Sequence, residues 1–241
     1  MVDPARALIA AVWAARHGVE TGASLRFAAL SQRMLSAGAP ASLVELAVRA
    51  SEDEQRHAAH CADILRARAA EVPPPETRVL TYAPGGLSTE QSLTYEVVAQ
   101  SCISETESMA TLVTLLDAAS DGHLKTVLHE LARDEVQHAR LGWAYLAWAR
   151  NRVDLSFLSE WLPGMAAGTA GPEMFEPGPP EVDDETLLRS GVVPRNQRRR
   201  VYLETLESVV IPGFQEFHVD TGPLRSWMEE KRRAVPVSSQ A

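Results

Sequence analysis

Two short stretches of the sequence repeat a pattern of acidic residues and histidine that could hold metal ions. Residues 53–58 read DEQRHA and residues 134–139 read DEVQHA. In each stretch a glutamate precedes a histidine by three positions, which places both side chains on one helix face, one turn apart. The pairs are Glu54 with His57 and Glu135 with His138. One such pair is more often a solvent-exposed ion pair, so a metal site needs further support.

Two more glutamates supply that support, because the sequence around them is repeated as well. VETGAS, which contains Glu20, aligns with SETESM, which contains Glu105. Glu105 follows Glu20 by 85 residues, and Glu135 follows Glu54 by 81. The first part of the chain therefore contains two similar units, each with a lone glutamate and a Glu-x-x-His pair.

Four long helices must position these residues, and the sequence predicts them between clear helix-ending signals. Asp3 followed by Pro4 is typical of a helix start, and Ser88 with Gln91 resembles a capping box. SAGAP at 36–40, three prolines from Pro73 and SDG at 120–122 interrupt the apolar periodicity. The predicted helices span residues 4–35, 40–72, 88–116 and 122–150. The predicted fold class is all-α, with two tight hairpins joined by a helix-free connector at 73–87.

Hairpin geometry brings the glutamates of each unit to the same height. In an antiparallel hairpin, two residues equally far from the turn lie level with each other. The midpoint between Glu20 and Glu54 falls at residue 37, inside SAGAP, and the midpoint between Glu105 and Glu135 falls at residue 120, inside SDG. Two facing hairpins would gather four carboxylates and two imidazoles in the middle of a bundle.

Such a buried cluster requires positive charge. Four carboxylates without counter-charge would have to protonate, contact water or bind cations. Two divalent cations balance four glutamates, and oxygen ligands with one imidazole per metal suit iron or manganese. We therefore expect two Fe ions, with a mixed Mn/Fe pair or two Mn ions as alternatives. A glutamate from each of two helices and a Glu-x-x-His pair from each of two others is the general di-iron or di-manganese ligand set of helix bundles.

The stretches VETGAS, SEDEQRHA, SCISETESMA and ARDEVQHARLGW together resemble the ferritin-like superfamily of di-iron carboxylate proteins, over about residues 8–150. The resemblance implies a ferritin-like four-helix bundle with a long crossover between its hairpins. It implies that one metal is bound by Glu20 and His57, the other by Glu105 and His138, and that two glutamates bridge both. The implied bridging residues are Glu54 and Glu135.

Asp53 and Asp134 each directly precede a bridging glutamate. The resemblance implies that an aspartate at this position accepts a hydrogen bond from a ligand imidazole, which would fix the tautomer of the histidine. An exposed acidic residue is an equally good interpretation from the sequence. Neither aspartate is expected to contact the metals directly.

The composition and the net charge limit the partners and the location expected for the protein. A net charge of -9 argues against nucleic acid as a partner, because phosphate binding needs clustered Lys and Arg. The N-terminus has an early acid and no basic leader with a cleavage site, and no apolar run is long enough to cross a bilayer. We therefore expect a cytoplasmic protein without a membrane partner. Two cysteines are too few for a disulfide framework, in agreement with a reducing compartment.

The predicted domains are a ferritin-like bundle at 1–150 and a C-terminal extension at 151–241. DLSFLSEWL predicts a short helix, residues 163–184 a long Pro- and Gly-rich loop, and DETLLRSG and RNQRRRVYLETLESVVIPGF two further helices. The tail PVSSQA is expected to be frayed. We expect the extension to pack on the bundle, near one end of the metal site, and this elaboration favours an enzyme over an iron-storage subunit.

Three functions remain open from the sequence. The first is a dinuclear metal enzyme that activates dioxygen to oxidise a small organic substrate and, if it is an oxygenase, takes electrons from a donor. The second is a ferroxidase or other iron-handling protein without an organic substrate. The third is a metal-free helical interaction module. The sequence leaves the substrate, the metal and the assembly state open, with a homodimer among the alternatives.

Overall fold

The computed structural model describes residues 3–119, 121–176 and 182–234. All regular elements of these ranges are helices, which confirms the predicted all-α class. Three of the four predicted bundle helices are α1 (Pro4–Ser36), α2 (Ala41–Ala67) and α5 (Gly122–Ala149). The predicted third helix is a continuous rod of α3 (Thr89–Val97), a π-helical segment (Val98–Ser104) and α4 (Glu105–Leu116).

The helices begin where the capping residues predict. The carboxylate of Asp3 accepts a hydrogen bond from Ala5 N at 3.0 Å, and Pro4 occupies the first turn of α1. Ser88 and Gln91 form the predicted capping box at the start of α3, with each side chain accepting from the backbone N–H of the other. These contacts satisfy donors that a helix N-terminus otherwise leaves without partners.

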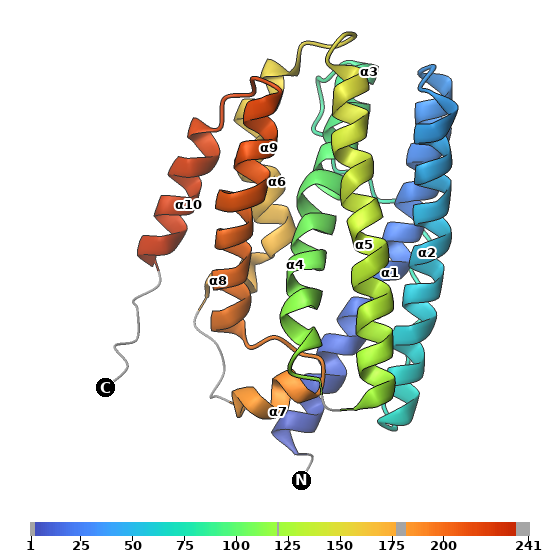
Figure 1. Ribbon diagram of the computed structural model, residues 1–241, viewed down its shortest axis with the longest axis vertical. Helices are drawn as coiled ribbons and strands as arrows, with labels where there is room; N and C mark the ends of the chain where they lie inside the picture. The colour runs from blue at the N-terminus through green and yellow to red at the C-terminus, as the bar shows by residue number, and fades with distance from the viewer. Residues whose placement is uncertain (1–2, 120, 177–181, 235–241) are drawn as a thin grey trace.

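The order of the helices follows the predicted long crossover. α1 runs up the bundle and α2 returns antiparallel to it, whereas α3 begins at the end opposite to where α2 stops (Figure 1). Residues 73–87 contain no helix and cover this distance along the bundle. The connector is held by Glu76 N, which donates to Thr21 Oγ1 at 3.1 Å, and by Glu96, which accepts from the N–H groups of Tyr82 and Ala83. The ferritin-like four-helix bundle is therefore confirmed.

The π-helical segment is the main departure from the predicted third helix. Such segments contain i→i+5 hydrogen bonds and locally change which side chains share a face. α5 approaches this segment closely at Gly142, where a Cβ atom would lie 2.6 Å from Cys102 Sγ and 2.9 Å from Cys102 N. Only glycine fits at this position without displacement of the neighbouring backbone.

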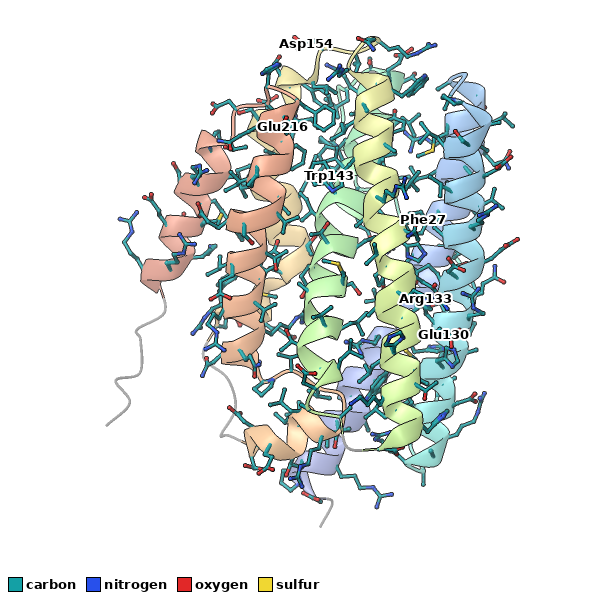
Figure 2. The ribbon with its side chains drawn as sticks, viewed as in Figure 1. Phe27, Glu130, Arg133, Trp143, Asp154 and Glu216 are labelled. Atoms are coloured by element: carbon teal, nitrogen blue, oxygen red, sulfur yellow. The ribbon has the colours of Figure 1, made fainter. Side chains whose placement is uncertain are left out.

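The described residues after 150 pack mainly against the second hairpin, on the side of α4 and α5, and residues 184–189 contact α1 (Figure 1). Their helices are α6 (Leu158–Ala170), α7 (Asp184–Arg189), α8 (Arg195–Thr205), α9 (Ile211–Glu216) and α10 (Gly222–Ala234), with a π-helical segment at Leu206–Val210. Trp143 of α5 lies against Phe214 and Phe217, with ring centroids 5.3 and 6.4 Å away (Figure 2). Cys102, Ile103 and Leu146 of the bundle share one apolar core with these helices. The boundary at residue 150 itself stays a prediction.

One expectation about the extension was wrong, and one helix was not predicted. Residues 163–170 were predicted to start a loop but continue α6, and Pro172–Phe175 forms a 3-10 turn. Buried apolar side chains recur along α6 at helical spacing, and their packing outweighs the Pro and Gly content: Leu158, Leu162, Met165, Ala166 and Ala170. α10 was not predicted. The rest of the predicted loop at 177–181 and the tail PVSSQA lie outside the described residues.

Within the described ranges, no helix combines the length and the apolar character that a bilayer crossing requires.

Candidate metal centre

The six residues expected as ligands meet in the interior of the bundle, and all six are buried. They form two overlapping groups, in each of which one atom per side chain lies within 4.8 Å of the others. The first group is Glu20, Glu54, His57 and Glu135, and the second is Glu54, Glu105, Glu135 and His138. Glu54 and Glu135 belong to both groups, as expected of side chains that bridge two ions. Whether metal occupies these positions stays a prediction.

Each ligand comes from the element that the sequence predicted. Glu20 lies on α1, Glu54 and His57 on α2, and Glu135 and His138 on α5. Glu105 is the first residue of α4, directly after the π-helical segment. The two hairpins face each other across this level, so their carboxylates converge despite the long connector between them.

Both imidazoles are held in the same way, through contacts that cross from one hairpin to the other. His57 Nδ1 lies 3.3 Å from Glu54 Oε2, and His57 Nε2 lies 3.4 Å from Asp134 Oδ2. His138 Nδ1 lies 3.2 Å from both Glu54 Oε1 and Glu135 Oε2, and its Nε2 lies 3.2 Å from Asp53 Oδ2. The aspartate of each hairpin thus contacts the histidine of the other. An aspartate on the outer nitrogen leaves the inner Nδ1 free to face a metal.

Arg56 joins the two aspartates, a contact that the sequence analysis missed. Its Nη2 lies 2.7 Å from Asp53 Oδ1 and 2.9 Å from Asp134 Oδ2, and Arg133 also pairs with Asp134. The signal was available, because Arg56 follows Asp53 by three residues on one helix. Arg56 therefore holds both outer carboxylates in position beneath the histidines.

The electrostatics of the cluster favour the protonated forms of Glu20, Glu105 and His138. Burial, together with the nearby Glu54 carboxylate, raises the pKa of Glu20 well above its usual range. Burial and the carboxylates of Glu135 and Glu54 raise the pKa of Glu105 in the same way. Burial disfavours the charged form of His138, but the surrounding carboxylates of Asp53, Glu135 and Glu54 outweigh this effect and raise its pKa. Metal binding at such a site releases protons.

The donor set fits two hard cations. Four glutamates and two imidazoles supply the oxygen-rich mixture that suits iron or manganese. Glu54 Oε1 is buried and accepts no hydrogen bond from the described residues, although His138 Nδ1 lies 3.2 Å away. A buried carboxylate oxygen without such a donor is costly unless a cation or another ligand contacts it.

Two polar side chains hold the carboxylates of the second hairpin. Ser108 Oγ donates to Glu135 Oε1 at 2.9 Å, and Gln100 Nε2 donates a short hydrogen bond to Glu105 Oε1. Gln100 was not foreseen, because it precedes Glu105 by five residues and such residues do not share a face of an α-helix. Only the π-helical segment brings them together.

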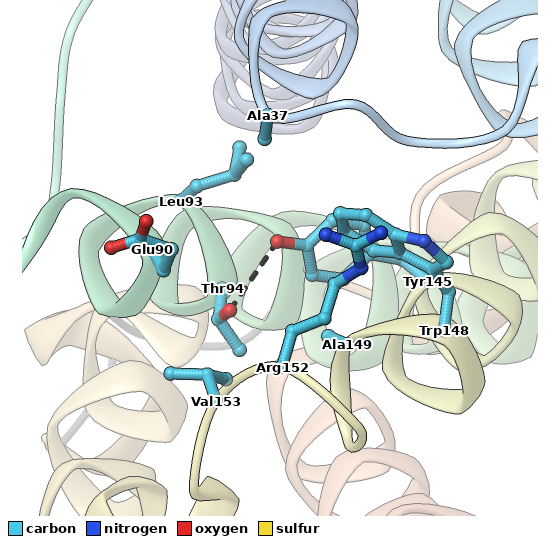
Figure 3. A pocket seen from close by; sticks show the side chains of 9 residues that line it. All are labelled: Ala37, Glu90, Leu93, Thr94, Tyr145, Trp148, Ala149, Arg152 and Val153. Atoms are coloured by element: carbon cyan, nitrogen blue, oxygen red, sulfur yellow. Dashed lines mark hydrogen bonds between the residues drawn. The ribbon is translucent and has the colours of Figure 1, made fainter.

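A cavity of about 330 Å³ lies at a distance from these ligands, at the end of the bundle where α1 and α5 finish (Figure 3). Within it, the hydroxyl groups of Thr94 and Tyr145 are 3.3 Å apart. Tyr145 follows His138 by seven residues on α5, or about 10 Å along a helix at 1.5 Å per residue, and none of the candidate ligands lines the cavity. Its lining residues are Ala37, Glu90, Leu93, Thr94, Tyr145, Trp148, Ala149, Arg152 and Val153. The cavity is therefore separate from the ligand cluster.

Comparisons with known proteins support the fold but not a family. No protein-family model matches this chain, and no curated protein sequence matches it either. Among solved structures, the chain is similar to "Protein 19 with aldehyde deformylating oxidase activity from Synechococcus", with a TM-score of 0.59 and 13% sequence identity. The similarity covers 95% of this chain and 98% of that one, so it includes the C-terminal helices as well as the four-helix bundle.

Proposed function

We propose that this chain is a non-haem dinuclear metal enzyme that activates dioxygen to oxidise a small organic substrate. The observation that carries the proposal is the ligand cluster, in which two groups of four side chains share Glu54 and Glu135. Glu20 with His57 would hold one ion and Glu105 with His138 the other. Iron is the first expectation, with manganese at one or both positions as the alternative. A reduced metal pair at these residues would supply two electrons to dioxygen.

The residues of the chain would orient and shield that chemistry. Asp53 and Asp134 hold the imidazoles by their outer nitrogens, which fixes the ring orientation. The apolar ring of Phe27 lies against His138, with 5.4 Å between ring centroids, and would limit access of water from that side. Cys61 and Cys102 are fully buried nearby on α2 and the π-helical segment.

An organic substrate is favoured over ferrous iron by the extension and by the structural relative. The described residues after 150 pack mainly against the second hairpin, and the relative, which has aldehyde deformylating oxidase activity, matches over the C-terminal helices too. Aldehydes are therefore the first substrate class to test. An electron donor would be required to return the metals to their reduced state between turnovers.

The first experiment measures bound metal and its dependence on a bridging glutamate. Protein purified without chelator should contain close to two equivalents of iron or manganese by elemental analysis. Glu54→Gln removes a carboxylate common to both groups and should lose most of the metal. Glu52→Gln, on the exposed face of the same helix, is the matched control and should retain it. Less than a tenth of an equivalent in the unmodified protein would refute the proposal.

The second experiment separates an organic substrate from iron. Reduced protein is mixed with dioxygen and a series of aldehydes, and oxygen uptake and products are followed by an oxygen electrode and mass spectrometry. Aldehyde-dependent product supports the proposal. Uptake that depends only on added Fe(II), with ferric iron as the product, supports the ferroxidase function instead.

A further inference from the structure

The two lone glutamates of the predicted metal centre are held very differently. Glu105 accepts a hydrogen bond from the side-chain amide of Gln100, which is only 5% exposed. The Glu20 carboxyl group lies beside that of Glu54, just as the Glu105 carboxyl group lies beside that of Glu135. On the face of α1 that carries Glu20, the residue four positions earlier is Arg16, whose charge acts on Glu20. Among the described residues, no amide group donates to Glu20 as Gln100 donates to Glu105.

The π-helical segment makes the contact between Gln100 and Glu105. In an α-helix each residue turns by about 100°, so side chains five residues apart point about 140° away from each other. Here Glu105 N donates to Gln100 O, an i→i+5 bond that widens the turn. The two side chains then lie on one face, and the amide of Gln100 reaches Glu105 Oε1.

Gln100 is itself fixed from the other side. Arg26 of α1 donates from Nε to Gln100 Oε1, so the amide group can point only its nitrogen toward Glu105. Arg26 Nη1 donates to the hydroxyl of Tyr82 at 3.1 Å, and its guanidinium lies 5.3 Å from the centre of the Tyr82 ring. Gly22 leaves room for this arrangement, because a Cβ there would lie 3.1 Å from Arg26 Nη1. A continuous chain of contacts thus links the connector to Glu105.

We propose that Gln100 is a positioning residue that fixes the carboxylate of Glu105, so that the Glu105–His138 position binds its metal ion more tightly than the Glu20–His57 position. This inference rests on the proposed dinuclear metal centre. A ligand already held in one orientation loses less conformational freedom on binding, and hydrogen bonds to ligands from neighbouring side chains are worth about 10- to 100-fold in metal affinity. Among the described residues no amide donates to Glu20, so this carboxylate would lose more conformational freedom on binding.

The test uses the full-length, metal-free chain titrated with Co²⁺, whose visible absorption reports its ligands, together with calorimetry. The unmodified chain should bind two ions in two distinguishable steps. Glu20→Ala should retain the tighter step, and Glu105→Ala should lose it. In the Glu20→Ala background, Gln100→Leu should weaken the remaining step by about 10- to 100-fold. In the Glu105→Ala background the same change should have no effect, because Gln100 has no carboxylate left to hold.

Controls separate positioning from a general effect on folding. Ser101→Ala removes a buried hydroxyl without a hydrogen-bond partner from the same π-helical segment and should change neither step. If Gln100→Leu does not fold, Tyr82→Phe still tests the chain of contacts, since Tyr82 is 47% exposed. It should weaken the tighter step alone by a few-fold.

The outcomes distinguish this inference from the proposed function. Equal losses in both backgrounds, no loss in either, or a tighter step that survives Glu105→Ala but not Glu20→Ala would overturn the inference and leave the metal centre intact. An unmodified chain that binds no Co²⁺ would overturn both.

Discussion

The two hairpins are similar in sequence and differ in how rigidly they hold the same residues. The first, α1 with α2, is α-helical throughout and its four-residue turn leaves both helices regular. The second contains a π-helical segment directly before Glu105, a close contact at Gly142 and a covering layer of C-terminal helices. A repeated ligand pattern thus does not imply equivalent surroundings, because the side chains around the ligands come from parts of the chain that are not repeated.

Among the tests of this difference between the hairpins, removal of the extension should have the largest effect on stability. Truncation after Arg150 would expose buried side chains of the second hairpin, among them Cys102, Ile103 and Leu146, which share one apolar core with the helices after residue 150. Exposed apolar surface of this kind causes aggregation or loss of cooperative unfolding. We expect the truncated chain to be largely insoluble, as measured by sedimentation and thermal unfolding. A truncated chain that stays soluble, unfolds cooperatively and keeps its metal content would show that neither hairpin needs the extension for its stability.

A smaller effect on stability is expected when a methyl group is added to one glycine of each hairpin. Gly142→Ala would place a Cβ within 3 Å of Cys102 and Ser101 and should destabilise the protein by about 1–3 kcal/mol. Gly18→Ala on α1 is the matched change, because a Cβ there meets no atom within 4 Å. It should stabilise the chain by about 0.5–1 kcal/mol through higher helix propensity. Urea unfolding measures both, and equal effects would remove the proposed distinction.

The smallest effect is expected at Asp53 and Asp134, where the two hairpins hold the histidines in similar ways. Asp53→Asn and Asp134→Asn each replace the carboxylate beside the opposite histidine and keep the size of the side chain. Each should weaken metal binding by about tenfold, or about 1.4 kcal/mol. We expect similar losses, measured by competition with a metal chelator. A loss confined to one variant would place the asymmetry of the site in the aspartates rather than in Gln100.

The sequence predicted the bundle and the placement of the six candidate ligands because both follow from regular geometry. Helical periodicity sets Glu54 beside His57, and equal distances from a turn set Glu20 level with Glu54. These relations hold wherever helices are regular. The crossover was implied only by resemblance, and the direction of α3 in the structure confirms it.

The parts that escaped prediction depend on irregular backbone or on distant contacts. The contact between Gln100 and Glu105 could not be predicted from the sequence because it requires a π turn, which no spacing rule for α-helices indicates. The helical course of residues 163–170 was hidden by Pro163 and nearby glycines, whose local preference is outweighed by burial of Leu162 and Met165. α10 has apolar residues at helical spacing, Leu224, Trp227 and Met228, and this signal was overlooked rather than absent.

The division of the candidate ligands between the two hairpins has a consequence for the order of events during synthesis. The first group of candidate ligands requires Glu135 from the second hairpin, and the second group requires Glu54 from the first. Neither hairpin can therefore complete a metal position before the other docks on it, however early it folds. At the proposed metal centre, no ion would find its full set of ligands until the ribosome has released the chain beyond His138, so metal loading would follow synthesis of the whole bundle.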